Sequence, residues 1–62
     1  MKKRYLKSVK IGSYKVVMQA NNFCFYITLY KNGKKIKVSE TPYVGDNERI
    51  FDDFVKQAKK GG

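Results

Sequence analysis

The stretch FCFYITLYKNGKKIKVS, from Phe23 to Ser39, decides the fold because it has the pattern of two strands joined by a tight turn. Its Asn32-Gly33 pair suits a type I′ turn, which needs a positive φ at both central residues. Aromatic and β-branched residues on either side of this turn are typical of strands. The stretch therefore predicts a β-hairpin, from which the rest of a sheet can be built outward.

Two more turn signals extend this hairpin towards the N-terminus. Gly12-Ser13 suits a type II′ turn, which takes glycine first, and Asn21-Asn22 suits a type I′ turn. Together, the three turns predict four strands, at residues 5–11, 14–20, 23–31 and 34–40.

Each two-residue turn also fixes which residues lie opposite each other. The predicted pairs bring apolar side chains together on one face, and they are Val9–Val16, Ile11–Tyr14, Met18–Phe25, Val16–Ile27, Tyr14–Leu29, Ile27–Val38 and Leu29–Ile36. A shift of one residue would turn the apolar side chains of a strand to the other face. Because the turns and the alternation agree, the sequence predicts a four-stranded antiparallel meander.

The spacing of the apolar residues changes after this sheet. In NERIFDDFVKQAKK they recur at helical intervals, and they are Ile50, Phe51, Phe54, Val55 and Ala58. We expect a helix over residues 47–60, with Asp46 or Asn47 capping its start and Gly61 capping its end.

The predicted fold is a single α+β domain over residues 1–62, in the order ββββα. The sheet covers residues 5–40, residues 41–46 connect it to the helix, and the helix packs on one face. Met1–Arg4 would form a mobile basic arm. So short a chain buries only about 60% of its unfolded surface, which disfavours a deep enclosed active site.

Charge is distributed unevenly along the chain, whose net charge is +9. Residues 1–39 contain ten of the 14 Lys and Arg residues and none of the five acids. Such segregation favours a polyanionic partner, although a basic surface without function is the plainer interpretation.

Histidine is absent, and Cys24 is the single cysteine, so the sequence lacks the usual general base and any internal disulfide. We therefore expect no enzymatic activity, no metal and no cofactor. No apolar run approaches the roughly 20 residues that cross a membrane, and no secretory signal follows the basic N-terminus. The expected location is intracellular.

The sheet face away from the helix is predicted to be basic and aromatic. Lysines suited to phosphates are Lys10, Lys15, Lys35 and Lys37, and the rings suited to bases are Tyr26 and Tyr30. The turns set Lys10 opposite Lys15 and Tyr30 beside Lys35. Thr28 shares this face, and Lys2, Lys3 and Arg4 would add diffuse affinity. Tyrosine is also common on half-exposed strands for reasons of propensity alone, so the rings are open to both interpretations.

The order of parts resembles a known family. The segments KIGSYKVVMQ, NGKKIKVSETP and NERIFDDFVKQ, read in sequence, resemble the positive-cofactor-type coactivators of transcription, which bind single-stranded DNA. The resemblance implies a ββββα fold, nucleic-acid binding on the sheet and dimers formed partly through the helix. The chain is less similar to the arm-type DNA-binding domains of tyrosine recombinases and to small basic chromatin proteins of thermophilic archaea.

The sequence thus predicts a non-enzymatic nucleic-acid-binding protein, with single-stranded DNA or RNA slightly favoured over duplex DNA. Its role would lie in transcription regulation, and it would be a monomer or a weak homodimer. The alternative is a small mobile-element or phage protein that docks on an acidic or nucleic-acid-binding partner protein, which an exposed Val17 would favour. A homodimer formed through the helix, with no ligand on the sheet, is the third hypothesis.

Overall fold

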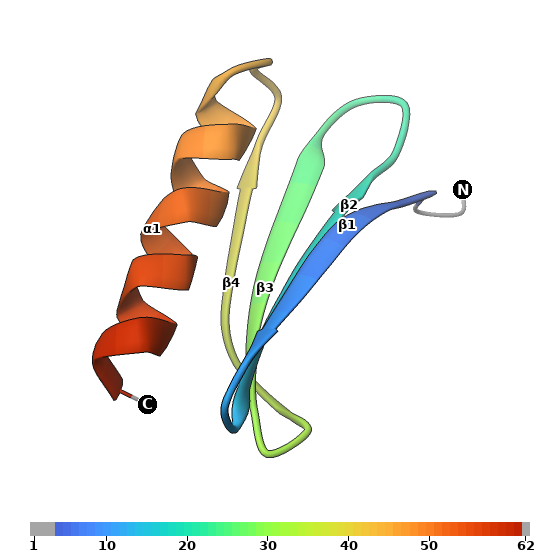
Figure 1. Cartoon of the computed structure of the whole chain (residues 1–62). Coiled ribbons are helices and arrows are strands. Elements are labelled where there is room, and N and C mark those ends of the chain that lie inside the picture. The colour runs from blue at the N-terminus through green and yellow to red at the C-terminus, as the bar shows by residue number, and fades with distance from the viewer. Residues whose placement is uncertain (1–3, 62) are drawn as a thin grey trace.

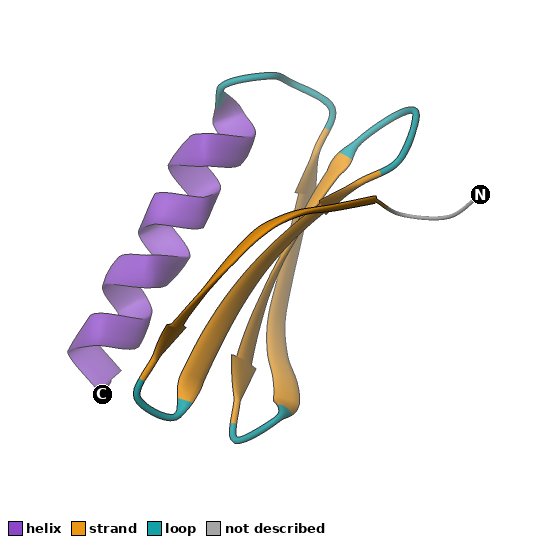
Figure 2. Cartoon of the chain, turned by 45° about the vertical axis from the view of Figure 1, so that its right-hand side comes forward, coloured by secondary structure: helices purple, strands orange, loops and turns teal. Residues whose placement is uncertain are grey.

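Four strands form one antiparallel sheet, and one helix covers one of its faces (Figure 1, Figure 2). The computed structural model describes residues 4–61. The strands are β1 (Arg4–Ile11), β2 (Tyr14–Ala20), β3 (Phe25–Lys31) and β4 (Lys34–Thr41), followed by α1 (Asp46–Gly61). They lie in sequence order across the sheet, so the predicted ββββα meander is confirmed. Arg4 is the first residue of β1 and not part of the expected arm.

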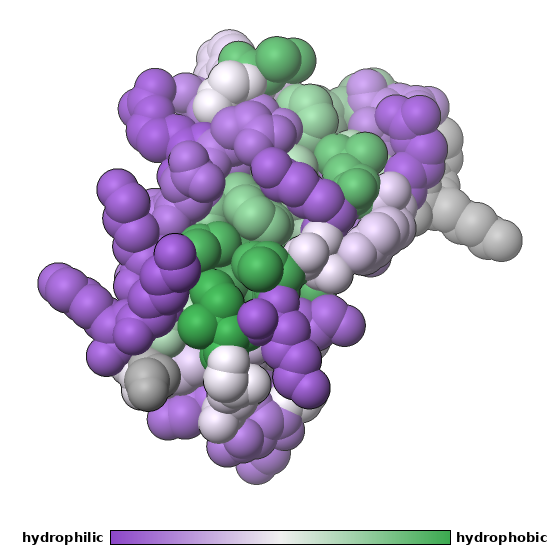
Figure 3. Space-filling view, in the orientation of Figure 1, coloured by the Kyte–Doolittle hydropathy of each residue, from purple (hydrophilic) through white to green (hydrophobic). Residues whose placement is uncertain are grey.

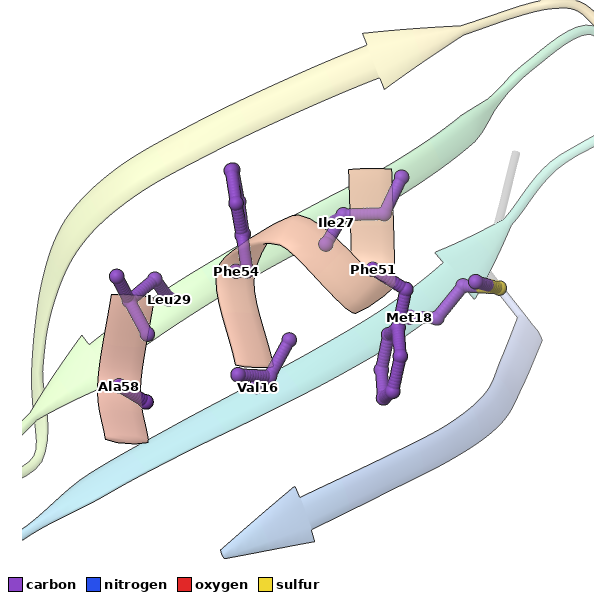
Figure 4. Close-up of a cluster of buried hydrophobic side chains, with 7 residues drawn as sticks. All are labelled: Val16, Met18, Ile27, Leu29, Phe51, Phe54 and Ala58. Carbon is purple, nitrogen blue, oxygen red and sulfur yellow. The ribbon is translucent and has the colours of Figure 1, made fainter. Parts of the chain in front are cut away.

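The core lies between α1 and the two central strands, as the apolar patterns predict. It consists of seven buried side chains, shown in Figure 4: Val16, Met18, Ile27, Leu29, Phe51, Phe54 and Ala58. Ile50 and Val55 complete the apolar stripe of the helix and are half-buried at the margin of this cluster. Within residues 4–61, no helix is long and apolar enough to span a membrane.

The loop between β2 and β3 is longer than the predicted two-residue turn, and it covers Asn21–Cys24. The Asn21 side chain stabilises this longer loop, because its Oδ1 accepts hydrogen bonds from the backbone N–H groups of Phe23 and Cys24, both at 2.8 Å. The three predicted pairs of this hairpin, Met18–Phe25, Val16–Ile27 and Tyr14–Leu29, are therefore wrong. Met18 lies opposite Ile27, Val16 opposite Leu29 and Tyr14 opposite Lys31. The register differs by two residues, so every side chain keeps its predicted face.

A β-bulge at Ile36 changes the faces of β4. Tyr30 lies opposite Lys35 as predicted, but Leu29 lies opposite Lys37 and Thr28 opposite Val38. The predicted pairs Leu29–Ile36 and Ile27–Val38 are wrong, because the bulge sets two residues of β4 against one of β3. After the bulge Lys37 faces the helix, whereas Val38 faces away from it.

A second bulge, at Leu6, changes the start of β1. Lys7 lies opposite Met18, but the next pair is Tyr5 with Gln19. Without the bulge, strict alternation would place Tyr5 on the helix side with Lys7. The bulge instead brings the Tyr5 ring to the sheet face opposite the helix.

The helix begins and ends differently from the prediction. Gly45, with a φ of 101°, precedes α1 and accepts its first hydrogen bond, from the Arg49 N–H at 3.2 Å. Asn47 is buried inside the first turn, where its Oδ1 accepts from the Gly45 N–H at 2.8 Å. Gly61 is helical and lies so close to Tyr14 that an added Cβ would stand 2.6 Å from the tyrosine hydroxyl oxygen.

Candidate nucleic-acid interface

The sheet face opposite the helix, here called the open face, carries three rows of side chains that run across the strands. The rows follow from the strand pairing, in the order β1 to β4: Lys10, Lys15, Tyr30, Lys35; then Ser8, Val17, Thr28, Val38; then Tyr5, Gln19, Tyr26, Glu40. The first row lies nearest the two hairpin turns at Gly12-Ser13 and Asn32-Gly33. We call it the basic row.

The basic row unites four of the residues that the sequence predicts as contacts. Lys10 and Lys15 lie directly opposite each other, Lys15 lies opposite Tyr30, and Tyr30 lies opposite Lys35. All three lysines are exposed, and Tyr30 is half-buried. Like charges directly opposite each other are destabilising, so a bound anion would relieve the repulsion between Lys10 and Lys15.

The middle row forms a floor for the open face. Val17 is only 9% exposed and Thr28 only 5%, although the helix covers the other side of the sheet. The flanking rows must therefore shelter these two side chains. Thr28, predicted as a contact, is placed to support this floor, and Val17 does not project as the exposed apolar residue that the alternative hypothesis uses.

The third row differs from the first in its electrostatics. Tyr26 lies opposite Glu40, an exposed carboxylate that the sequence-based description of the face leaves out. The Tyr26 hydroxyl accepts a hydrogen bond from Asn21 Nδ2 at 2.9 Å. A hydrogen bond with the Cys24 side chain, followed by desolvation, raises the pKa of Tyr26, and Glu40 adds to the effect. Tyr26 and Tyr30 are therefore not equivalent, and only Tyr30 stands among lysines.

A hollow of about 730 Å³ opens at the turn end of this face. Its lining combines rings, lysines, the sheet floor and both hairpin turns: Tyr5, Lys10, Gly12, Ser13, Tyr14, Lys15, Val17, Tyr30, Asn32 and Gly33. The Asn32 N–H donates to the Ser13 carbonyl oxygen at 2.9 Å and so ties the two turns together. Sequence reasoning missed Tyr5, because only the bulge at Leu6 brings it to this face.

Lys37 does not belong to the open face, contrary to the prediction. Its Nζ lies 5.2 Å from the centre of the Phe54 ring and 3.4 Å from Gln57 Oε1, both on α1. Lys7 occupies the corresponding place on β1, where its Nζ pairs with Glu48 and lies 4.5 Å from the centre of the Phe51 ring. Both lysine side chains therefore extend from the edge strands of the sheet to aromatic rings of the helix.

Arg4, another of the predicted basic contacts, lies away from the basic row. Arg4 is exposed at the beginning of β1, opposite Ala20 at the far end of the sheet. Lys2 and Lys3 lie outside the described residues.

Apolar surface is also exposed outside the core. On β4, Ile36 is 52% exposed and Val38 is 50% exposed. Tyr43 and Val44 are exposed in the loop between β4 and α1. Figure 3 shows hydrophobic surface both over this loop, at the top, and in the middle of the view.

The chain matches no protein-family model, no curated protein and no solved structure. The resemblance to single-stranded-DNA-binding coactivators stays a prediction.

Proposed function

We propose that this chain is a non-enzymatic protein that binds nucleic acid on its open face, with single strands favoured over duplex. The observation that carries the proposal is the basic row, in which Lys10, Lys15 and Lys35 flank the Tyr30 ring without an acid among them. Lysines at such positions neutralise phosphates and release counterions, which supplies affinity for any polynucleotide.

The dimensions of the row suit a short piece of polynucleotide. Neighbouring strands lie about 4.8 Å apart, so three strand spacings separate β1 from β4 by about 14 Å. The acids of α1 lie on the covered side of the sheet or beyond it, where they do not repel a strand along this row. The exposed Glu40 marks the other end of the open face.

Tyr30 supports the preference for single strands. An aromatic ring among lysines binds an unstacked base by its face, and such stacking contributes about 1–3 kcal/mol per base. In a duplex the base faces are already covered by their neighbours. A duplex would therefore engage the lysines of the row but gain little from the ring.

The test is a fluorescence-anisotropy titration of a labelled single strand at about 50 and about 200 mM salt. The variant Lys10→Ala, Lys15→Ala should lower the slope of log affinity against log salt by at least about 0.7, which is the contribution of one neutralised phosphate on a single strand. The matched control is Lys59→Ala, Lys60→Ala, which removes the same charge from the end of α1 and should leave the slope nearly unchanged. Equal slopes in the two double variants would contradict the proposal.

A second candidate function, docking on a partner protein, is favoured by the apolar side chains of β4. Ile36 and Val38 are half-exposed, and Val38 is followed on the same face by Glu40, a combination that suits a protein surface better than a phosphate backbone. This candidate replaces the first if neither single strands nor duplexes bind at the lower salt concentration.

A further inference from the structure

We propose that the hollow at the turn end of the open face receives one unpaired nucleotide, with its base between Tyr5 and Tyr30 and its phosphate on Lys10 and Lys15. This inference rests on the proposed function, and it names the part of the nucleic acid that the face selects. The hollow has the size of a ligand site, since its volume of about 730 Å³ falls within the range of about 300–1,000 Å³ that is usual for such sites.

The walls of the hollow are fixed before any ligand arrives. The backbone hydrogen bond of 2.9 Å from Asn32 to Ser13 holds the two hairpin turns at a set separation. On the opposite wall, the Tyr5 hydroxyl shares a hydrogen bond of 2.6 Å with Ser8 Oγ, which orients a ring that is otherwise 63% exposed. These two hydrogen bonds reduce the conformational freedom that the turns and the Tyr5 ring would lose on binding, so more of their contact energy is available for affinity.

The lining has separate parts for the separate parts of a nucleotide. Tyr5 and Tyr30 present aromatic rings, and Val17 gives an apolar floor, which together suit the flat face and edge of a base. Lys10 and Lys15 lie opposite each other and suit one phosphate group between them.

The combined lining favours a nucleotide over an inorganic anion or a neutral aromatic molecule. An inorganic anion would use only the two lysines, and a neutral aromatic molecule would leave their repulsion in place. No carboxylate from residues 4–61 lines the hollow, so anion binding meets no opposing charge there. A base pair would not enter, because both base faces and the pairing edge are covered in a duplex.

The experiment compares an intact single strand with a strand of the same length whose central nucleotides lack their bases. Both strands have the same phosphates, so the comparison isolates the base. On the unaltered protein, the strand without bases should bind about 5- to 150-fold more weakly than the intact strand.

Two tyrosine variants locate the effect. In Tyr30→Ala the difference in affinity between the two strands should become several-fold smaller, because one of the two rings that contact the base is gone. Tyr26→Ala is the matched control, since it removes the same side chain from the same strand and face but outside the hollow. It should preserve the difference. If Tyr30→Ala does not fold, as judged by circular dichroism, Tyr5→Ala serves in its place at an exposed position.

The outcomes separate the two proposals. Equal affinity of both strands for the unaltered protein would overturn the nucleotide site and leave the proposed function standing. A difference that stays unchanged in both Tyr30→Ala and Tyr5→Ala would also overturn it, because the base would then be bound elsewhere. Absence of binding by either strand at low salt would overturn the proposed function itself.

Discussion

Lys35 and Lys37 stand two positions apart on β4, yet the bulge at Ile36 places them on opposite faces of the sheet. We therefore expect Lys35→Ala to change binding but not stability, and Lys37→Ala to change stability but not binding. Lys35 is an exposed member of the basic row, so its removal should cost one phosphate contact. One contact on a single strand changes the salt slope by about 0.7, which amounts to about 2.5-fold in affinity between about 50 and about 200 mM salt.

Lys37→Ala should leave that slope unchanged, because the Lys37 ammonium lies 5.2 Å from the Phe54 ring and 3.4 Å from Gln57 Oε1 on the helix. Loss of the contact with the ring should instead lower the free energy of unfolding by about 0.5–1 kcal/mol. Lys35→Ala should not change the free energy of unfolding. Anisotropy titrations measure the slope, and urea denaturation followed by circular dichroism measures the stability. A slope lowered equally by both substitutions would refute the assignment of the two lysines to different faces.

Three further predictions concern the core, the helix start and alkaline pH. Ile27→Val, at a fully buried position, should lower the free energy of unfolding by about 0.5–1.5 kcal/mol in urea denaturation. Asn47→Ala should cost about 1–2 kcal/mol in the same assay because the Gly45 N–H loses its acceptor. The hydrogen bond with Cys24 raises the pKa of Tyr26 above its ordinary value of 10.0, so the folded state favours the neutral phenol. Below pH 10.0 this preference contributes fully to stability, and the contribution is lost as pH rises from 10.0 through the higher pKa of the folded state. Above pH 10, Tyr26→Phe should therefore lose less stability than the unaltered protein, as measured by urea denaturation.

Local residue chemistry accounts for the parts of the fold that were predicted correctly. Gly12, Asn32 and Gly33 have φ values of 57°, 54° and 82°, as type II′ and type I′ turns require. These turns fix the pairing next to them, which is why the Lys10–Lys15 and Tyr30–Lys35 pairs were predicted correctly. The apolar stripe of α1 was also predicted correctly, because residues at helical spacing lie on one face of a helix.

The Asn21 loop was mispredicted although its sequence carries a usable signal. Asparagine side chains often accept hydrogen bonds from backbone N–H groups two or three residues ahead, and Asn21 does so at Phe23 and Cys24. This turn competes with the tight type I′ turn that the Asn21-Asn22 pair also suits. The error left the faces unchanged, because it moved the register by an even number of residues.

The two bulges could not be predicted from local residues. Neither Leu6 nor Ile36 is a glycine or a proline, and both lie in segments with ordinary strand composition. A bulge increases the local twist of a strand, and its position depends on how the whole sheet packs against the helix. Each bulge shifts the alternation by one residue, so the two bulges account for the largest differences between the predicted and the observed open face. Tyr5 and Val38 lie on the open face, and Lys37 does not.

The bulge at Ile36 itself can be tested by deleting that residue. Ile36 and Lys37 together oppose Leu29, so a chain without Ile36 can keep Lys37 opposite Leu29 and every later pair unchanged. Ile36 is about half exposed, and its removal should therefore cost only about 1 kcal/mol of burial. We expect the deletion variant to keep the amide NMR spectrum of the core and the salt slope of the full chain.

Deletion of Val38, a residue of similar size and exposure, is the matched control. Val38 lies opposite Thr28 in regular pairing, so its loss can be absorbed only if the bulge disappears. Ile36 would then lie opposite Leu29, and Lys37 would lie opposite Thr28 on the open face. The Val38 deletion should therefore shift the amide resonances of Leu29 and Thr28, and it should raise the salt slope because Lys37 joins the open face. If the two deletions give the same amide shifts and the same slope, Ile36 is not the extra residue, and the placement of Lys37 and Val38 on their present faces would be refuted.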